Sequence, residues 1–413
     1  MRPTTGTEVA PFFRIDSLAR SLVHVAPPAA ASAPLATPST LSAVTRADVC
    51  IAGAGLSALL AAYLLVRARR SVVLVEESAI GAMQPGIGTA RMSTLPDAPW
   101  RSVRDAEGAQ AARVSARSHA AAVEALEAIV RRERIACELE RLDAYCEVEG
   151  GLRGARIERD AAVAAGIAEA EVVQSLAVPG GTWGPTVRYP GQVRLQPLKL
   201  ALGLANAVTR AGGRVLLGTA PAALTSDRAA LATSGGQRIE ADVIVTAHAL
   251  HAGGRLETVT APHLAHVVGV HVARGALPQA LYRDARAFPI DASLLSHGRG
   301  AGEVLLVGGE DPPGDDDHTA FRYLALERWA CERFPGAGPV VHRGTVQAVH
   351  ERELFAFSRE RAGGMQACAR GGSALTRAML DALAIAGYVE AADTPWPELY
   401  LRAAPVREPA RPG

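Results

Sequence analysis

The sequence predicts an α/β fold in which a dinucleotide-binding βαβ unit is interleaved with an α+β domain. Residues 48–77 read DVCIAGAGLSALLAAYLLVRARRSVVLVEE, which gives an apolar strand, a glycine turn, an apolar helix and a second apolar strand in that order. The chain has 413 residues, too many for one compact core, so two domains are expected. Its second half contains short strand-like segments separated by turn residues, which is typical of an antiparallel sheet.

The glycine turn within residues 48–77 has the properties of a phosphate-binding loop. Gly53 permits a tight turn from strand to helix, Gly55 lacks a Cβ that would keep a pyrophosphate away, and Ala58 is small enough for the helix to pack on the strand. The free N–H groups at the start of the helix then face the pyrophosphate. Glu76 ends the second strand, where a carboxylate can accept hydrogen bonds from ribose hydroxyls. The alternative is an ordinary βαβ unit with a glycine turn.

Hydrophobic periodicity and turn residues predict the remaining elements in order. Residues 26–42 are rich in Ala, Pro, Ser and Thr, which indicates a surface arm. A proline at the first helical position predicts a helix from Pro197 to Arg210, which Gly212 and Gly213 end. The other expected helices cover residues 105–135, 158–168, 318–334 and 374–386. The other expected strands cover residues 134–148, 187–195, 215–217 and 243–246, and 304–307 is the clearest strand within 262–310.

Composition and charge argue against several classes of function. The net charge of +1 gives no electrostatic reason to expect binding to nucleic acid or to an anionic membrane. The sequence contains no run of 18 apolar residues, so no membrane span is expected. The five cysteines are scattered without CxxC spacing, so neither a metal site nor a disulfide framework is expected. A reducing compartment fits this cysteine usage, and a cytoplasmic location is therefore expected.

The order of these features resembles the FAD-dependent oxidoreductases of the D-amino-acid-oxidase superfamily, which includes glycine, sarcosine and gamma-glutamylputrescine oxidases. The resemblance covers residues 46–400. It rests on the stretches ADVCIAGAGLSALLAAYLL with VVLVEE, the loop GIGTAR, QVRLQPLKLALGLANAVTRAGGRV with IEADVIVTA, VLLVGGEDPPGDDD with YLALERWACERFP, and DTPWPELYLRAAPVR.

The resemblance implies a Rossmann-like FAD-binding domain of the glutathione-reductase type, interleaved with an α+β substrate domain built on an antiparallel sheet. The expected segments are an N-terminal arm or linker (1–45), a first FAD-binding segment (46–105), a mostly helical insertion of the substrate domain (106–186), a second FAD-binding segment (187–260), the main part of the substrate domain (261–345), a C-terminal FAD-binding segment (346–400) and a tail (401–413).

The resemblance also implies FAD as the cofactor and assigns residues to it. The ADP half is expected at Gly53, Ala54, Gly55, Leu56, Ser57, Glu76 and Glu77. The flavin ring is expected beside Gly88, Thr89, Ala90 and Arg91, and against the turn formed by Gly372, Ser373, Ala374, Leu375 and Thr376. No metal is expected in this site.

Departures from the family pattern are concentrated at the ring end. Family members usually carry Asp-Gly-x-Pro-x-x-Gly where residues 353–359 read ELFAFSR, without either glycine or the proline. They usually carry Trp-x-Gly-Gln where residues 344–347 read GTVQ. Ala374 replaces a glycine whose missing Cβ lets the backbone approach the isoalloxazine. The ADP end therefore matches the family, whereas the ring end differs from it.

The chemistry implied by the resemblance is oxidation of a C–N bond in a small-molecule amine or amino acid, or in a related biosynthetic intermediate, by hydride transfer to flavin N5. A guanidinium can bond a substrate carboxylate at two places, and Arg91 is the first candidate for this role, ahead of Arg322 and Arg343. The alternative is a diverged, redox-inactive member that acts as a binding or assembly subunit of an oxidoreductase complex. The sequence leaves open whether the chain forms an oligomer or binds a partner subunit.

Overall fold

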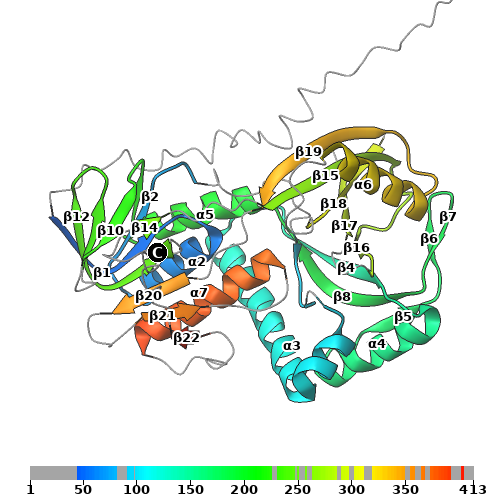
Figure 1. The fold of residues 1–413 in the computed structure, drawn as a ribbon, viewed down its shortest axis with the longest axis horizontal. Helices are drawn as coiled ribbons and strands as arrows, with labels where there is room; N and C mark the ends of the chain where they lie inside the picture. The colour runs from blue at the N-terminus through cyan, green and yellow to red at the C-terminus, as the bar shows by residue number, and fades with distance from the viewer. Residues whose placement is uncertain are drawn as a thin grey trace, which may run out of the picture.

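The computed structural model contains two nine-stranded sheets that lie side by side, each with helices packed against it (Figure 1). The structure describes residues 44–80, 91–96, 98–225, 230–246, 249–250, 256–257, 263–285, 290–296, 302–310, 319–348, 354–358, 364–367, 373–391 and 401–403. Strands of the two sheets alternate along the chain. The predicted α/β class with an interleaved second sheet is therefore confirmed.

The first sheet has the predicted βαβ unit at its centre. Its strands are β1 (Val44–Ala52), β2 (Val72–Glu76), β9 (Arg214–Leu217), β10 (Pro221–Leu224), β11 (Ala230–Thr233), β12 (Arg238–Thr246), β20 (Leu354–Ser358), β21 (Gly364–Ala367) and β22 (Leu401–Ala403). Their order is β22-β21-β20-β12-β1-β2-β9, and β10 pairs with β11, which in turn pairs with β12. The central strands β12, β1, β2 and β9 are parallel, so their carboxyl ends meet at one edge of the sheet.

Three helices bury the apolar side chains of this half: α2 (Leu56–Arg67), α5 (Pro197–Arg210) and α7 (Ala374–Glu390). Ten of the twelve residues of α2 are buried, as expected for a helix enclosed by other elements. It packs against both other helices and against β2. Ile51, Leu59, Leu74 and Ile385 belong to the core that these elements share. This packing fixes the turn between β1 and α2, where the phosphate-binding loop is predicted.

The second sheet is largely antiparallel. Its strands are β3 (Arg91–Met92), β4 (Glu140–Glu147), β5 (Glu171–Val173), β8 (Thr186–Arg194), β15 (His263–Ala273), β16 (Ala280–Arg283), β17 (Ile290–Ser296), β18 (Gly302–Glu310) and β19 (Val340–Ala348). Their order is β19-β15-β18-β17-β16-β4-β8-β3, with β5 beside β8, and the pair β16–β4 is parallel. Two small hairpins are formed by β6 (Leu176–Val178) with β7 (Gly181–Trp183), and by β13 (Ala249–Leu250) with β14 (Leu256–Glu257).

Helices cover the two faces of the second sheet in different places. Helix α6 (Thr319–Arg333) packs on β15 and β18, and Trp329 joins Phe334 and Tyr282 in an aromatic cluster there. Helix α3 (Trp100–Glu133), which contains a break at Gly108, packs along α4 (Gly151–Ala165). These two helices share an alanine-rich core with β4, β8 and β16. The second half therefore has its own cores, separate from that around α2.

Several predicted boundaries differ from the structure. Helix α4 begins at Gly151 rather than at residue 158. Strand β3 lies in the second sheet because Arg91 and Met92 pair with Arg194 and Val193 of β8. Strand β8, which the sequence-based division assigns to the range 187–260, belongs to the same second sheet. The division of the chain into domain segments stays a prediction.

No helix in the described ranges is both long and apolar enough to cross a membrane. Within the same ranges, no group of three or more His, Cys, Asp or Glu side chains could hold a metal ion. Cys50, Cys137, Cys146 and Cys331 are free thiols. Burial raises the pKa of Cys50 and of Cys146 to about 12, so both stay protonated at neutral pH.

Candidate functional site

The turn between β1 and α2 forms an open cradle at the carboxyl edge of the parallel strands. Gly53 has a φ of 108°, which favours glycine, and its N–H donates to the carbonyl of Val75 at 2.8 Å. Gly55 is the N-cap residue of α2, and no side chain at this position occupies the free amides of the first turn. A Cβ built on Gly55 would have no atom within 4 Å. The first amides of α2 have no intrahelical acceptors and begin beside this open space, which makes the cradle suited to a diphosphate.

The carboxylate of Glu76 lies beside the cradle. Its Oε2 accepts a hydrogen bond from the Ala54 N–H, and its Oε1 accepts one from the Ser78 N–H, both at 2.8 Å. Each oxygen keeps a further lone pair with which it can accept a ribose hydroxyl. Leu56 and Ser57 begin α2 and are buried, whereas Glu77 is exposed. The residues predicted for the ADP half therefore lie together and fit that group.

Replacing Glu76 with glutamine should weaken FAD binding by about 10-fold to 100-fold, because the amide carries less charge and cannot accept at both positions. Titrating the apoprotein with FAD and following the quenching of flavin fluorescence measures the change. Glu149→Gln is the control, because that side chain is 79% exposed and lies on another part of the surface. Equal affinities for the Glu76 variant and the wild type would contradict the assignment.

The turn predicted to lie over the flavin ring contacts the segment that directly follows the predicted ring loop. The Ser93 N–H donates to Thr376 Oγ1 at 3.1 Å, and this hydroxyl donates to the Ser93 carbonyl at 2.8 Å, across 283 positions of sequence. Ser373 caps α7 and accepts from the Thr376 N–H. Leu375 is buried at the start of this helix, whereas Ala374 is exposed. Gly88, Thr89, Ala90 and Gly372 lie outside the described residues.

Gln192 is a residue of this junction that the sequence does not single out. It is fully buried on β8, and its Oε1 accepts from Ser93 Oγ and from the Thr94 N–H, both at 2.8 Å. Its Nε2 donates to the carbonyl of Pro190 at 2.8 Å. The strand that follows the predicted ring loop is thereby tied both to α7 and to the second sheet. A lone glutamine in a strand-like stretch carries no sequence signal for this role.

Arg91 is paired with a carboxylate of the chain itself. Its guanidinium contacts Asp291 on β17, and Arg283 of β16 places its Nε 3.1 Å from the same carboxylate oxygen. Burial, followed by the charge of Arg283, lowers the pKa of Arg91. Arg343 pairs with Glu327 of α6. A substrate carboxylate would therefore have to share Arg91 with Asp291, and its role in substrate binding stays a prediction.

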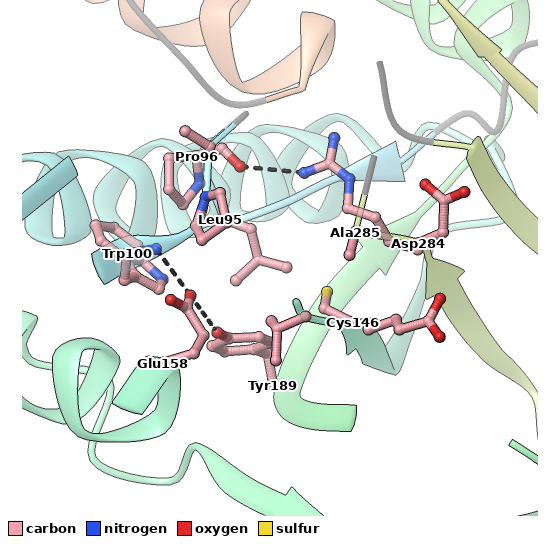
Figure 2. Close-up of a pocket in the computed structure, with 13 residues that line it drawn as sticks. Leu95, Pro96, Trp100, Cys146, Glu158, Tyr189, Asp284 and Ala285 are labelled. Atoms are coloured by element: carbon pink, nitrogen blue, oxygen red, sulfur yellow. Dashed lines mark hydrogen bonds between the residues drawn. The ribbon is translucent and has the colours of Figure 1, made fainter. Parts of the chain in front are cut away.

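A small pocket of about 50 Å³ lies near the ends of β4 and β16 (Figure 2). Glu158 of α4 accepts hydrogen bonds there from the backbone N–H groups of Trp100 and Arg101 and from the hydroxyl of Tyr189, at 2.8–3.0 Å. Its carboxylate therefore fixes the start of α3 on the second sheet. Arg283, which also lines the pocket, donates to the carbonyl of Pro96 at 3.1 Å. These contacts hold structural elements together, and the pocket is separate from the cradle.

Comparisons with known proteins agree with this geometry. The family described as "DAO: FAD dependent oxidoreductase" matches residues 48–386. Glycine oxidase from Geobacillus kaustophilus superposes with a TM-score of 0.56 at 18% identity, over 85% of this chain and 96% of that one. L-amino acid deaminase from Proteus vulgaris, with its specific insertion deleted, gives 0.60 at 13% identity over 89% and 96%. Iminodiacetate oxidase from Chelativorans sp. BNC1 gives 0.57 at 17% identity over 85% and 98%. No curated protein matches the sequence.

Proposed function

The chain belongs to the family of FAD-dependent oxidoreductases, whose cofactor is FAD, and from that premise we propose that it oxidises a C–N bond of a small amine or amino acid. The observation that supports this most is the cradle around Gly53 and Gly55, with Glu76 held beside it. The structural neighbours whose names include glycine oxidase and iminodiacetate oxidase support an amine or amino-acid substrate. Bound FAD supplies an acceptor for the hydride that leaves the carbon next to the substrate nitrogen.

The protein contributes binding and orientation to this reaction. The amides at the start of α2 and the Glu76 carboxylate bind the ADP half. The Ser93–Thr376 hydrogen bonds join the turn expected over the ring to the segment that follows the predicted ring loop. Because Gln192 ties the same segment to β8, the ring site and the second sheet are held in one relative position. Fixed positioning of the reacting groups is one of the contributions that a protein makes to cofactor chemistry.

The FAD-loaded protein should be reduced under nitrogen by at least one compound in a panel of amines and amino acids. The expected result is loss of the visible absorption of oxidised flavin, followed by its return when an electron acceptor is added. The product should be the carbonyl compound together with ammonia or the shorter amine, since water hydrolyses the imine that remains. An FAD-loaded protein that no compound in the panel reduces would contradict the proposed function.

A second candidate function is a redox-inactive subunit of an oxidoreductase complex. The observation that favours it is the altered sequence at the ring end, where residues 353–359 lack both family glycines and Ala374 replaces another. Its signature would be a protein that is purified colourless and cannot be loaded with FAD. Tight FAD binding without reduction by any amine would instead indicate a flavoprotein that acts on a different class of substrate.

A further inference from the structure

The carboxyl-terminal ends of four helices, α2, α3, α5 and α7, meet at one place on the surface. The Tyr63 hydroxyl of α2 donates to Glu133 at the end of α3, and Arg210 at the end of α5 donates to the same carboxylate, both at 2.9 Å. Arg70, just after α2, pairs with Glu390 at the end of α7 at 2.8 Å. The diphosphate cradle lies at the other end of α2, roughly 18 Å away for a helix of twelve residues, so this surface is separate from it.

Seven exposed arginines gather on this surface, which we call the arginine patch. They come from two runs that are distant in sequence and from the end of α5: Arg67, Arg69, Arg70, Arg131, Arg132, Arg134 and Arg210. Among the described residues, the ion pairs of the patch are those of Arg70 with Glu390 and of Arg210 with Glu133. The other five guanidinium groups have no described carboxylate within ion-pair distance. The patch is therefore strongly positive, although the whole chain has a net charge of only +1.

Two of these arginines occupy backbone positions that favour glycine. Arg69 has a φ of 65° and Arg134 a φ of 52°. Each is the left-handed residue of a Schellman motif, in which its N–H and the next N–H donate back to carbonyls of the last helical turn. Helices α4 and α5 end in the same motif with Gly166 and Gly212 at this position, and α7 ends at a left-handed Ala391. The backbone therefore does not require arginine at either end.

The helix dipoles explain only part of the patch. The carbonyl end of a helix favours cations in its last turn, which accounts for Arg67 in α2 and for Arg131 and Arg132 in α3. At Arg69 and Arg134, glycine would close the same turns without the strain of a left-handed side chain. The charge at these two positions therefore indicates a role outside the fold.

We propose that the arginine patch binds an acidic segment of a partner protein, whose Asp and Glu carboxylates pair with the guanidinium groups. A guanidinium matches a carboxylate with two parallel hydrogen bonds, and five of the seven have no such partner within the described chain. Because the patch and the cradle lie at opposite ends of α2, this inference does not rest on the proposed function.

Other polyanions fit the patch less well. Proteins that bind single-stranded nucleic acid stack its bases on exposed aromatic rings, whereas Tyr63, which lies beneath the patch, is only 2% exposed. Surfaces that bind membranes combine basic residues with exposed apolar side chains. Phe321 and Leu324, the two most exposed large apolar side chains in the described ranges, lie on α6 in the other half. An acidic protein segment needs neither feature.

A fluorescein-labelled decaglutamate peptide tests the inference on the full-length protein by fluorescence anisotropy. The wild type should bind the peptide, more tightly at about 50 mM than at about 200 mM NaCl, because salt screens exposed charges. Arg69→Gly combined with Arg134→Gly should weaken binding by about 5-fold. The Tm of this variant should not fall, since glycine suits both left-handed positions. Arg69→Lys combined with Arg134→Lys should retain most of the affinity, because the charge remains.

The control combines Arg153→Ala with Arg156→Ala, which removes two exposed arginines from α4 in the other half. It should change the affinity for the peptide by less than about 2-fold. Failure of the wild type to bind the peptide, or equal weakening by the control and by the glycine variant, would overturn the inference.

Two further measurements distinguish other occupants of the patch. A short DNA duplex and vesicles that contain phosphatidylserine are titrated in the same way, and tighter binding of either than of the peptide, lost in the glycine variant, would overturn the inference. Sedimentation velocity would overturn it in favour of a second copy of this chain if the wild type formed an oligomer that the glycine variant did not. FAD should bind the glycine variant and the wild type equally, so the proposed function stands or falls separately.

Discussion

Replacing Gly55 with aspartate should abolish FAD binding while leaving the apoprotein as stable as the wild type. The backbone at Gly55 is extended (φ −64°, ψ 167°), which any residue can adopt, and a Cβ there meets no atom within 4 Å. Aspartate is a better helix cap than glycine, so α2 should not be weakened. Its carboxylate would occupy the space of the diphosphate. Like charges about 4 Å apart near a protein surface repel by roughly 4 kcal/mol, which corresponds to a loss of about 1,000-fold in affinity.

The affinity is measured by titrating the apoprotein with FAD, and stability by thermal unfolding of the apoprotein. Gly181→Asp is the matched control, because Gly181 lies in β7 at the far end of the second half and a Cβ there makes only an ordinary contact with Pro335, at 3.9 Å (Figure 1). It should bind FAD like the wild type. If the Gly55 variant bound FAD within about 10-fold of the wild type, the diphosphate would not lie over this turn.

Replacing Asp291 with alanine should lower the free energy of unfolding by about 3–5 kcal/mol, because removing one partner leaves buried charge uncompensated. Asp291 is 8% exposed and contacts the guanidinium groups of both Arg91 and Arg283. Urea denaturation followed by circular dichroism measures the change. The control is Asp160→Ala, which removes an exposed carboxylate paired with Arg159 and should cost no more than about 1 kcal/mol. Similar losses for the two variants would show that the buried cluster does not hold β3 against the second sheet.

Local signals in the sequence were sufficient to predict many of the helices and strands. Helix α5 begins at Pro197 and ends at Arg210 as predicted, because a proline fixes the first turn and Gly212 stops the last. The start of α4 was missed because Gly151 and Gly154 lie in its first turn, where glycines usually indicate a loop. A Cβ on Gly154 would lie 1.9 Å from the Glu149 carbonyl oxygen, so close packing rather than helix propensity explains that glycine. Helix propensity alone therefore could not predict that α4 begins at Gly151.

The candidate site was predictable to the extent that its residues are close in sequence. Gly53, Gly55 and Glu76 belong to one βαβ unit, whose geometry follows from a strand, a turn and a helix. The contact between Arg91 and Asp291 depends on how the second sheet brings β3 near β17, which no local pattern encodes. The role of Gln192 likewise depends on β8 lying beside β3. These partners could be found only once the strand order was known.

A crystal structure of the FAD-loaded protein tests the central claim most directly, since that claim concerns what occupies the cradle between β1 and α2. We expect the diphosphate of FAD over Gly55, within hydrogen-bond distance of the first amides of α2, and the ribose hydroxyls on the Glu76 carboxylate. A cradle filled by the chain's own side chains, or FAD bound with its diphosphate elsewhere, would contradict the account.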